Sequence, residues 1–186
     1  MSQLTRDEER DQVLKLARQA KKVAPQFAQL STPRKNEILV RAAENLVART
    51  PEILEANERD VAAGRAAGMN DSLIDRLSLD AARVEGIADG LRQVAALQDP
   101  VGEVLRGHNM DNGIQMKQVR VPLGVMGMVY EARPNVTVDA FGLALKSGNV
   151  PLLRGSKSAR NSNEQLVEIL QDTLAHFELP REGVQL

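Results

Sequence analysis

The chain has 186 residues, of which 42% are hydrophobic and 26% charged, with 24 Lys and Arg against 25 Asp and Glu. This composition is typical of one globular domain or two small ones and excludes collagenous, coiled-coil and wholly disordered chains. The balanced charge provides no field that would gather nucleic acid, and no apolar run approaches the ~20 residues that a membrane helix needs.

The sequence contains no Cys and only 2 His. The lack of Cys excludes a disulfide framework and a thiol nucleophile within these residues, and a metal site or a Ser-His relay is not expected. The charged N-terminal segment lacks the apolar core of a secretory signal. We therefore expect a soluble cytoplasmic protein with neither a nucleic-acid nor a membrane partner.

Apolar residues recur at three- and four-residue intervals through the first half of the chain, which predicts helices. The first helix is expected to break at Pro25. The Thr-Pro pairs at 32–33 and 50–51 each resemble an N-cap followed by proline at the first helical position. Asn70 or Asp71 is expected to cap a short helix, and Asp80 is expected to cap the helix after it.

The second half has a different period. Residues 114–121 alternate apolar and polar, as an exposed strand or hairpin does. Val125–Tyr130 is almost entirely apolar, which predicts a strand buried on both faces of a parallel sheet. A helix over Asn135–Leu145, a second apolar strand at 150–153, another helix and a third strand from Val184 are expected to follow.

This order of strands and helices with short connections predicts a Rossmann-like parallel sheet with right-handed crossovers. The expected fold class is α/β, with a helical segment over 1–105, a strand or hairpin over 106–121 and the first part of the sheet over 122–186. Because a parallel sheet needs cover on both faces and the third strand has barely begun at Leu186, we expect the chain to be a truncated piece of a larger protein.

The turn Tyr130-Glu-Ala-Arg-Pro-Asn135 follows the first sheet strand, at the end where open α/β sheets bind ligands. A helix N-terminus there offers N–H groups and a positive dipole end to an anion or a developing oxyanion. Asn135 can donate a hydrogen bond to such a group, or it can simply cap the helix. Arg133 can contact an anion or remain a surface residue.

The loop Arg154-Gly-Ser-Lys-Ser158 follows the second sheet strand and combines two cations, a glycine and two hydroxyl groups. That set suits a phosphate, including the 2′-phosphate that distinguishes NADPH from NADH. The loop has neither the dinucleotide fingerprint nor a P-loop, so a solvated polar loop is the alternative.

Five other residues have structural interpretations. Lys146 and His176 lie near helix C-termini, where a cation interacts favourably with the dipole. His108 is expected in an exposed polar loop. Met126 and Met128 are expected in the core of the sheet.

Residues 119–139, VRVPLGVMGMVYEARPNVTVD, closely resemble the signature region of the gamma-glutamyl phosphate reductases, also called glutamate-5-semialdehyde dehydrogenases. The resemblance continues through 145–149 and 153–155, with shorter upstream matches such as 54–57 and 75–77, and spans nearly all of the chain. This family belongs to the aldehyde dehydrogenase superfamily. The resemblance therefore implies the N-terminal part of that fold.

The same resemblance implies reduction of L-glutamate 5-phosphate to L-glutamate 5-semialdehyde by NADPH, with release of phosphate, in proline biosynthesis. In that chemistry a cysteine thiolate attacks the acyl phosphate, and hydride transfer to the resulting thioester gives the aldehyde. Asn135 matches the asparagine that helps to hold the thioester oxygen, a role that can coexist with capping.

The resemblance also implies which residues bind the NADPH/NADP cofactor. The expected cofactor-binding residues are Glu131, Arg133, Pro134, Arg154, Gly155, Ser156 and Lys157. The first three would line the cofactor cleft. Arg154 stands where many superfamily members place a lysine at the adenosine ribose, and the residues after it would follow the nucleotide phosphate.

Partners are implied in the same way. The chain is expected to form a homo-oligomer, since residues 114–121 resemble part of the oligomerisation arm. A second expected partner is glutamate 5-kinase, which makes the substrate. Family members run to roughly twice this length and carry the nucleophilic cysteine in the half absent here, so the chain alone is expected to be inactive. Two alternatives remain: a stand-alone, non-catalytic nucleotide-binding or oligomerisation module, and another dehydrogenase of the superfamily.

Overall fold

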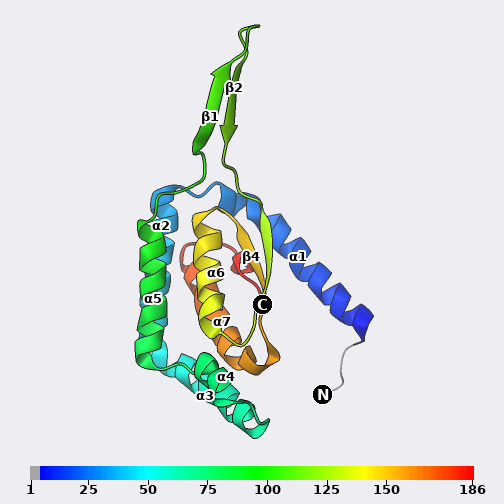
Figure 1. Cartoon of the computed structure of the whole chain (residues 1–186), viewed down its shortest axis with the longest axis vertical. Helices are drawn as coiled ribbons and strands as arrows, with labels where there is room; N and C mark the ends of the chain where they lie inside the picture. The colour runs from blue at the N-terminus through cyan, green and yellow to red at the C-terminus, as the bar shows by residue number, and fades with distance from the viewer. Residues whose placement is uncertain (1–4) are drawn as a thin grey trace.

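The computed structural model describes residues 5–186, which form a helical half and a half that contains the strands (Figure 1). The helical half comprises α1 (Arg6–Ala28), α2 (Thr32–Ala48), α3 (Thr50–Ala66), α4 (Asp71–Leu77) and α5 (Ala81–Ala96). The second half comprises β1 (Val104–Asn109), β2 (Gln115–Val119), β3 (Val125–Val129), α6 (Pro134–Lys146), β4 (Val150–Arg154), η1 (Lys157–Ala159), α7 (Arg160–His176) and η2 (Arg181–Gly183). The expected α/β class and order of elements are confirmed. Among the described residues, none of the helices has the length and apolar character needed to span a membrane.

The sheet is built on β3 and β4, which pair in parallel over their whole lengths. After α7 the chain returns beside β4, where the N–H of Gln185 donates to the carbonyl of Pro151 (3.3 Å) and the N–H of Leu153 donates to the carbonyl of Gln185 (2.8 Å). The strand order is therefore β3, β4, Gln185. Both crossovers run along the sheet from β3 towards Gln185, and because crossovers are right-handed, α6 and α7 lie on the same face of the sheet. Helix α1 packs against β3 and β4 on the opposite face.

One hydrophobic core joins the two halves. Its fully buried side chains include Phe27, Leu39, Leu91, Phe141 and Leu166, which come from α1, α2, α5, α6 and α7. Helix α2 packs along α5 and α7, and α5 packs along α6. Helices α2, α3 and α5 therefore cover the outer side of the layer formed by α6 and α7.

Strands β1 and β2 form an antiparallel hairpin that projects from this body (Figure 1), and all their residues are exposed. The hairpin predicted around residues 114–121 is confirmed. The polar loop predicted at His108 is wrong, because this residue lies in β1 and pairs with Met116. Cross-strand hydrogen bonds hold a polar segment in extended form here, although little of it is buried.

The helix boundaries show where burial overrides local signals. Helix α1 continues through Pro25 to Ala28, so the predicted break is wrong. Pro25 removes one backbone hydrogen bond, but Ala24 and Phe27 beside it are buried and hold the last turn against the core. The caps at Asn70 and Asp80 are confirmed, since each side chain accepts the N–H three residues later.

The two Thr-Pro pairs do not cap helices as predicted. The N-cap of α2 is Ser31, whose hydroxyl accepts from the N–H of Arg34 (3.4 Å). The hydroxyl of Thr50 donates to the carbonyl of Val47 (2.8 Å), so it serves the end of α2 rather than the start of α3. Proline still occupies the first turn of each helix, where its missing N–H costs nothing.

Strand β3 is less buried than predicted. Its first two residues are half-buried, but the side chains of Met128 and Val129 are 39% and 83% exposed. Among the described residues β3 pairs only with β4, so its other edge is uncovered. The prediction of a strand buried on both faces, with Met128 in the core, is therefore wrong.

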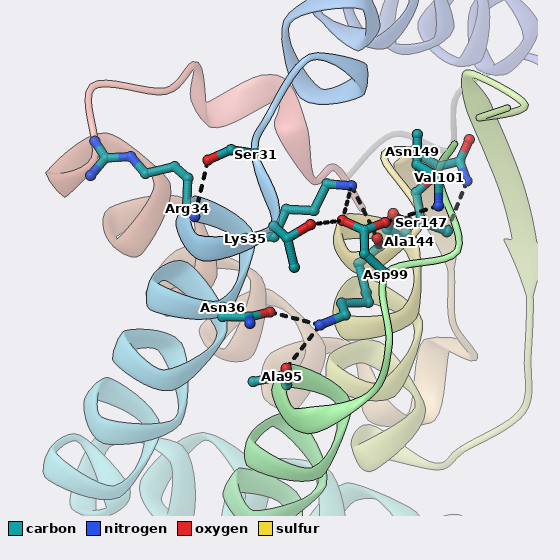
Figure 2. Close-up of polar contacts among 12 residues, drawn as sticks. Ser31, Arg34, Lys35, Asn36, Ala95, Asp99, Val101, Ala144, Ser147 and Asn149 are labelled. Atoms are coloured by element: carbon teal, nitrogen blue, oxygen red, sulfur yellow. Dashed lines mark hydrogen bonds and ion pairs between the residues drawn. The ribbon is translucent and has the colours of Figure 1, made fainter. Parts of the chain in front are cut away.

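Two buried lysines lie where α2, α5 and α6 converge, and the first of them pairs with a carboxylate (Figure 2). The ammonium of Lys35 donates to Oδ2 of Asp99 (2.9 Å) and to the carbonyl of Lys146 (3.3 Å). The ammonium of Lys146 donates to Oδ1 of Asn36 (2.7 Å) and to the carbonyl of Ala95 (2.8 Å). These contacts fix the C-terminus of α6 against the helical half.

Asp99 also anchors the connection from α5 to β1. Its Oδ2 accepts from the hydroxyl of Thr32 (2.8 Å), and its Oδ1 accepts from the N–H of Val101 (2.9 Å). Burial raises the pKa of Asp99, but the bonds from Lys35, Val101 and Thr32 outweigh burial and leave the pKa below its ordinary value. The base of the hairpin is therefore tied to the body by a charged group.

Candidate functional site

The two predicted ligand-binding loops lie together at the carboxyl ends of β3 and β4. The N–H of Tyr130, after β3, donates to the carbonyl of Arg154, at the end of β4 (3.1 Å). This edge is where open α/β sheets bind ligands. Of the residues predicted to bind the cofactor, Glu131, Arg133, Arg154 and Lys157 are exposed, Ser156 is half-buried, and Pro134 and Gly155 are buried.

Asn135 lies in the first turn of α6 but does not cap it. The helix begins at Pro134, and Arg133 is the N-cap residue, with no side-chain cap bond. The interpretation of Asn135 as the cap is therefore wrong, because Pro134 takes the first helical position that its fixed φ suits. The amide Nδ2 of Asn135 instead donates to Oδ2 of Asp139 (3.1 Å), one turn later. An amide has two N–H groups, so one remains for a ligand.

Asp139 faces this amide from the same helix. Partial burial raises the pKa of Asp139, and the hydrogen bond from Asn135 lowers it by less. The hydrogen bond also sets the orientation of the Asn135 amide, since the carboxylate can only accept.

A cleft of about 500 Å³ opens between the first turn of α6 and the helices α4 and α5. The residues lining it are Arg133, Asn135 and Asp139 from the α6 side and Asp75, Arg76, Ser78, Leu79, Arg83, Gly86 and Ile87 from the other side. Its charged lining comprises three guanidinium groups and two carboxyl groups. None of residues 154–157 lines it.

The cleft arginines have different environments. Arg83 donates to the carbonyls of Asp75 (2.5 Å) and Ser78 (2.8 Å) and to Oδ1 of Asp75 (2.6 Å), so it fastens the end of α4 to α5. Within residues 5–186 the guanidinium groups of Arg76 and Arg133 donate to no protein acceptor. Both side chains are exposed.

A chain of hydroxyl and amide groups runs beneath the turn after β3. The phenol oxygen of Tyr130 lies 2.6 Å from Oγ1 of Thr137, whose hydroxyl donates to Oδ1 of Asn163 (2.9 Å). Because the proton of Thr137 points to Asn163, Tyr130 donates to Thr137. Burial raises the pKa of Tyr130, and the bond to Thr137 lowers it by less, so Tyr130 stays a neutral donor. This network was missed by the sequence analysis.

The same network explains Gly155. A Cβ at this position would lie 2.2 Å from Nδ2 of Asn163 and 3.2 Å from two atoms of the Tyr130 ring. Only glycine lets the loop after β4 approach these side chains so closely. Among the described residues, Nδ2 of Asn163 is buried without a hydrogen-bond partner.

The other loop residues present polar groups at the end of β4. The guanidinium of Arg154 donates to the carbonyl of Gly155 (2.6 Å). The hydroxyl oxygens of Ser156 and Ser158 lie 2.8 Å apart. With Lys157 also exposed, two cations face solvent at this edge.

The N-terminus of α7, beyond this loop, is occupied by a carboxylate from α3. Oδ1 of Asp60 accepts from the backbone and side-chain amides of Asn161 (3.2 and 2.7 Å), and Oδ2 accepts from the N–H and hydroxyl of Ser162 (2.8 and 2.6 Å). These N–H groups are therefore not free for a phosphate. The exposed cations of the loop after β4 are Arg154 and Lys157.

Comparison with known proteins agrees with this fold. Residues 3–186 match the model of the aldehyde dehydrogenase family. The gamma-glutamyl phosphate reductase of Thermotoga maritima is 40% identical, with a TM-score of 0.89 over 93% of this chain and 42% of that protein. The gamma-glutamyl phosphate reductase of Saccharomyces cerevisiae is 31% identical, with a TM-score of 0.87 over 99% of this chain and 46% of that protein. A probable aldehyde dehydrogenase of Listeria monocytogenes, 14% identical, shares the fold over 94% of this chain and 36% of that protein, with a TM-score of 0.68.

The coverage figures show that the chain spans less than half the length of either reductase. The matched region includes both loops at the sheet edge, the cleft and the projecting hairpin. The chain belongs to the aldehyde dehydrogenase family.

Proposed function

We propose that the chain is the N-terminal part of a reductase that converts L-glutamate 5-phosphate to L-glutamate 5-semialdehyde with NADPH and releases phosphate. The observation that carries the proposal is the placement of Asn135, in the first turn of α6 and beside a charged cleft. The similarity to two gamma-glutamyl phosphate reductases, at 40% and 31% identity, supports this substrate over that of another dehydrogenase.

Asn135 would donate its free N–H to the carbonyl oxygen of the reacting acyl group. Such a donor stabilises the oxyanion that forms when a nucleophile attacks, provided that it is held in place beforehand. The hydrogen bond to Asp139 and the fixed start of α6 at Pro134 supply that fixed position. We therefore assign Asn135 the catalytic role in this part of the enzyme.

The loop after β4 fits a phosphorylated nucleotide by the chemistry of its donors. Arg154 and Lys157 are exposed cations, Ser156 adds a hydroxyl group, and Asp60 already occupies the neighbouring helix N-terminus. We propose that Arg154, Gly155, Ser156 and Lys157 bind the ribose and its phosphate, and that Glu131 and Pro134 line the same side. NADPH, when bound, would supply the hydride.

The reaction as proposed also uses a cysteine thiolate, and these 186 residues contain no Cys. We propose that the complete protein supplies this nucleophile from outside the chain and that the chain alone has no reductase activity. We further propose a cytoplasmic homo-oligomer joined through the hairpin, where Val104, Leu105 and Met116 are exposed. Glutamate 5-kinase would supply the unstable acyl phosphate.

The test is a reductase assay on the complete protein and on the 186-residue chain in parallel. The expected result is consumption of NADPH that depends on L-glutamate 5-phosphate and releases one phosphate per hydride, with the complete protein only. Turnover by the chain alone would contradict the need for the cysteine. No turnover by the complete protein, with saturable NADPH binding by the chain, would instead support a non-catalytic nucleotide-binding module.

A further inference from the structure

We propose that Arg76 and Arg133 bind the two anionic groups of the amino-acid substrate in the cleft between α4, α5 and α6. The inference rests on the proposed function and deepens it by naming the residues that select a phosphorylated amino acid. It also moves Arg133 from the cofactor, which it was expected to contact, to the substrate.

The arginines of the cleft differ in whether their guanidinium groups already have protein acceptors. Both guanidinium groups line the cleft and have no acceptor within residues 5–186. Arg83, the third arginine of the cleft, already donates three hydrogen bonds to Asp75 and the carbonyl of Ser78. Guanidinium groups bind carboxylates and phosphates through paired, charge-assisted hydrogen bonds. Among the described residues, Arg76 and Arg133 are therefore the cleft arginines whose guanidinium groups are not engaged by protein acceptors.

The charges of the cleft match those of a zwitterionic amino acid. L-Glutamate 5-phosphate carries an α-carboxylate, an α-ammonium and a phosphoryl group. Asp75 is engaged by Arg83, whereas Asp139 accepts only one bond, from Asn135, and keeps acceptor capacity for an ammonium group. The cleft therefore offers both signs of charge that an amino-acid substrate requires.

Arg76 and Arg133 lie at different places along the cleft. Arg133 precedes Asn135 by two residues, so it lies next to the acyl group that Asn135 would hold. Arg76 lies on α4, across the cleft. We therefore assign the phosphoryl group to Arg133 and the α-carboxylate to Arg76. A volume of about 500 Å³ is within the usual range for a small-molecule site.

The cleft is also separate from the predicted nucleotide loop. None of residues 154–157 lines it, and Arg133 and Asn135 are the turn residues that do. Substrate and cofactor would thus approach the first turn of α6 from different sides. This arrangement predicts that substitutions in the two places affect different Michaelis constants.

The experiment is a kinetic analysis of the complete enzyme in the oxidative direction. The cysteine thiolate adds to the aldehyde carbon of L-glutamate 5-semialdehyde, and the adduct loses a hydride to NADP, which leaves a thioester. Inorganic phosphate then attacks the acyl carbon and gives up its proton to solvent, the C–S bond breaks, and the thiolate leaves as the acyl phosphate forms. The expected result for Arg133→Gln is an increase of about tenfold or more in the KM for phosphate, and for Arg76→Gln a similar increase in the KM for the semialdehyde. The KM for NADP should change less than about twofold.

Arg59→Gln is the matched control, since Arg59 is exposed, pairs within the described residues only with Glu55 and does not line the cleft. Its three KM values should equal those of the wild type. Increases confined to the KM for NADP, or unchanged KM values in both cleft variants of an active enzyme, would overturn the proposal. Because both arginines are exposed and unpaired within residues 5–186, the variants should melt at the wild-type temperature.

A second measurement separates this proposal from the proposed function. Isotope-labelled chain is titrated with L-glutamate and followed by the side-chain NMR signals of its arginines. Saturable shifts at Arg76 and Arg133, with none at Arg154, would support the cleft even if the complete protein reduced no acyl phosphate. Shifts at Arg154 alone, or no shifts, would overturn it.

Discussion

Lys35 donates a hydrogen bond to Asp99 over 2.9 Å, with side chains that are only 1% and 11% exposed. This buried ion pair joins α2 to the connection between α5 and β1. The same ammonium group also reaches the carbonyl of Lys146 at the end of α6. One side chain therefore holds three elements whose relative positions set the hairpin and the helix that carries Asn135.

Replacing Lys35 with Met should lower the free energy of unfolding by about 3 kcal/mol, because Asp99 would stay buried without its main counterion. Urea denaturation of the chain followed by circular dichroism measures the change. Arg59→Met is the matched control. It removes an exposed pair with Glu55 and should cost about 0.5 kcal/mol or less. Equal losses in the two variants would show that the Lys35 pair contributes no more than a surface pair.

Lys146 should make the fold more stable as the pH rises into the alkaline range. Burial lowers the pKa of its ammonium group, Asp99 raises it by less, and Lys35 lowers it further. Between this lowered folded pKa and the unfolded value of about 10.4, the unfolded chain binds more protons, so stability increases with pH. Denaturation midpoints from pH 7 upward measure the slope.

Lys146→Met provides the comparison for that titration. The variant has no group to titrate at this position, so its stability should rise less over the same pH range. If the wild type and the variant showed the same slope, the alkaline titration would have to come from other groups.

Gly155→Ala should lower the free energy of unfolding by about 1–3 kcal/mol, as overpacking of a core does. The new Cβ would meet the buried amide of Asn163 at 2.2 Å and the Tyr130 ring at 3.2 Å. Gly86→Ala in α5 is the control, since no atom lies within 4 Å of its Cβ position. The control should gain about 0.5–1 kcal/mol from helix propensity. Thermal melting of both variants measures the two changes. A loss of stability in Gly155→Ala would show that glycine is needed for close packing, and an unchanged melting temperature would show that it is not.

Asn135→Ala in the complete enzyme should lower kcat by about 10²-fold, as loss of an oxyanion donor does. The fold should survive, because Asn135 does not cap α6 and donates only to the nearby Asp139. Steady-state kinetics together with the melting temperature check both statements. A kcat near the wild-type value would leave Asn135 with no catalytic role.

Features with a local cause could be predicted from the sequence. The caps at Asn70 and Asp80, the hairpin around 114–121 and the order of strands and helices each follow from neighbouring residues. The end of α1 beyond Pro25 could not, because it depends on packing: Phe27 holds the last turn of α1 on the core. The start of α6 differs from the prediction for a local reason, since Pro134 suits the first helical position and Arg133, not Asn135, is the N-cap.

The loops of the candidate site could be predicted from the sequence, whereas the cleft and the contact at Gly155 could not. The two loops follow from the strand pattern, since parallel strands bring their carboxyl ends to one edge. The cleft does not follow from the strand pattern. Arg76 and Arg133 come from separate elements that only the packing of α5 on α6 brings together. The contact between Gly155 and Asn163 likewise depends on the register of α7 beneath the sheet edge.

The carboxylate of Asp60 has a consequence for how the chain opens and closes. It satisfies the first amides of α7 from a residue more than a hundred positions earlier, so that turn cannot be completed until α3 has docked. The amide hydrogens of Asn161 and Ser162 should therefore exchange with solvent only when α3 detaches. Such long-range closure slows folding, and it makes the helical half and the sheet half a single cooperative unit.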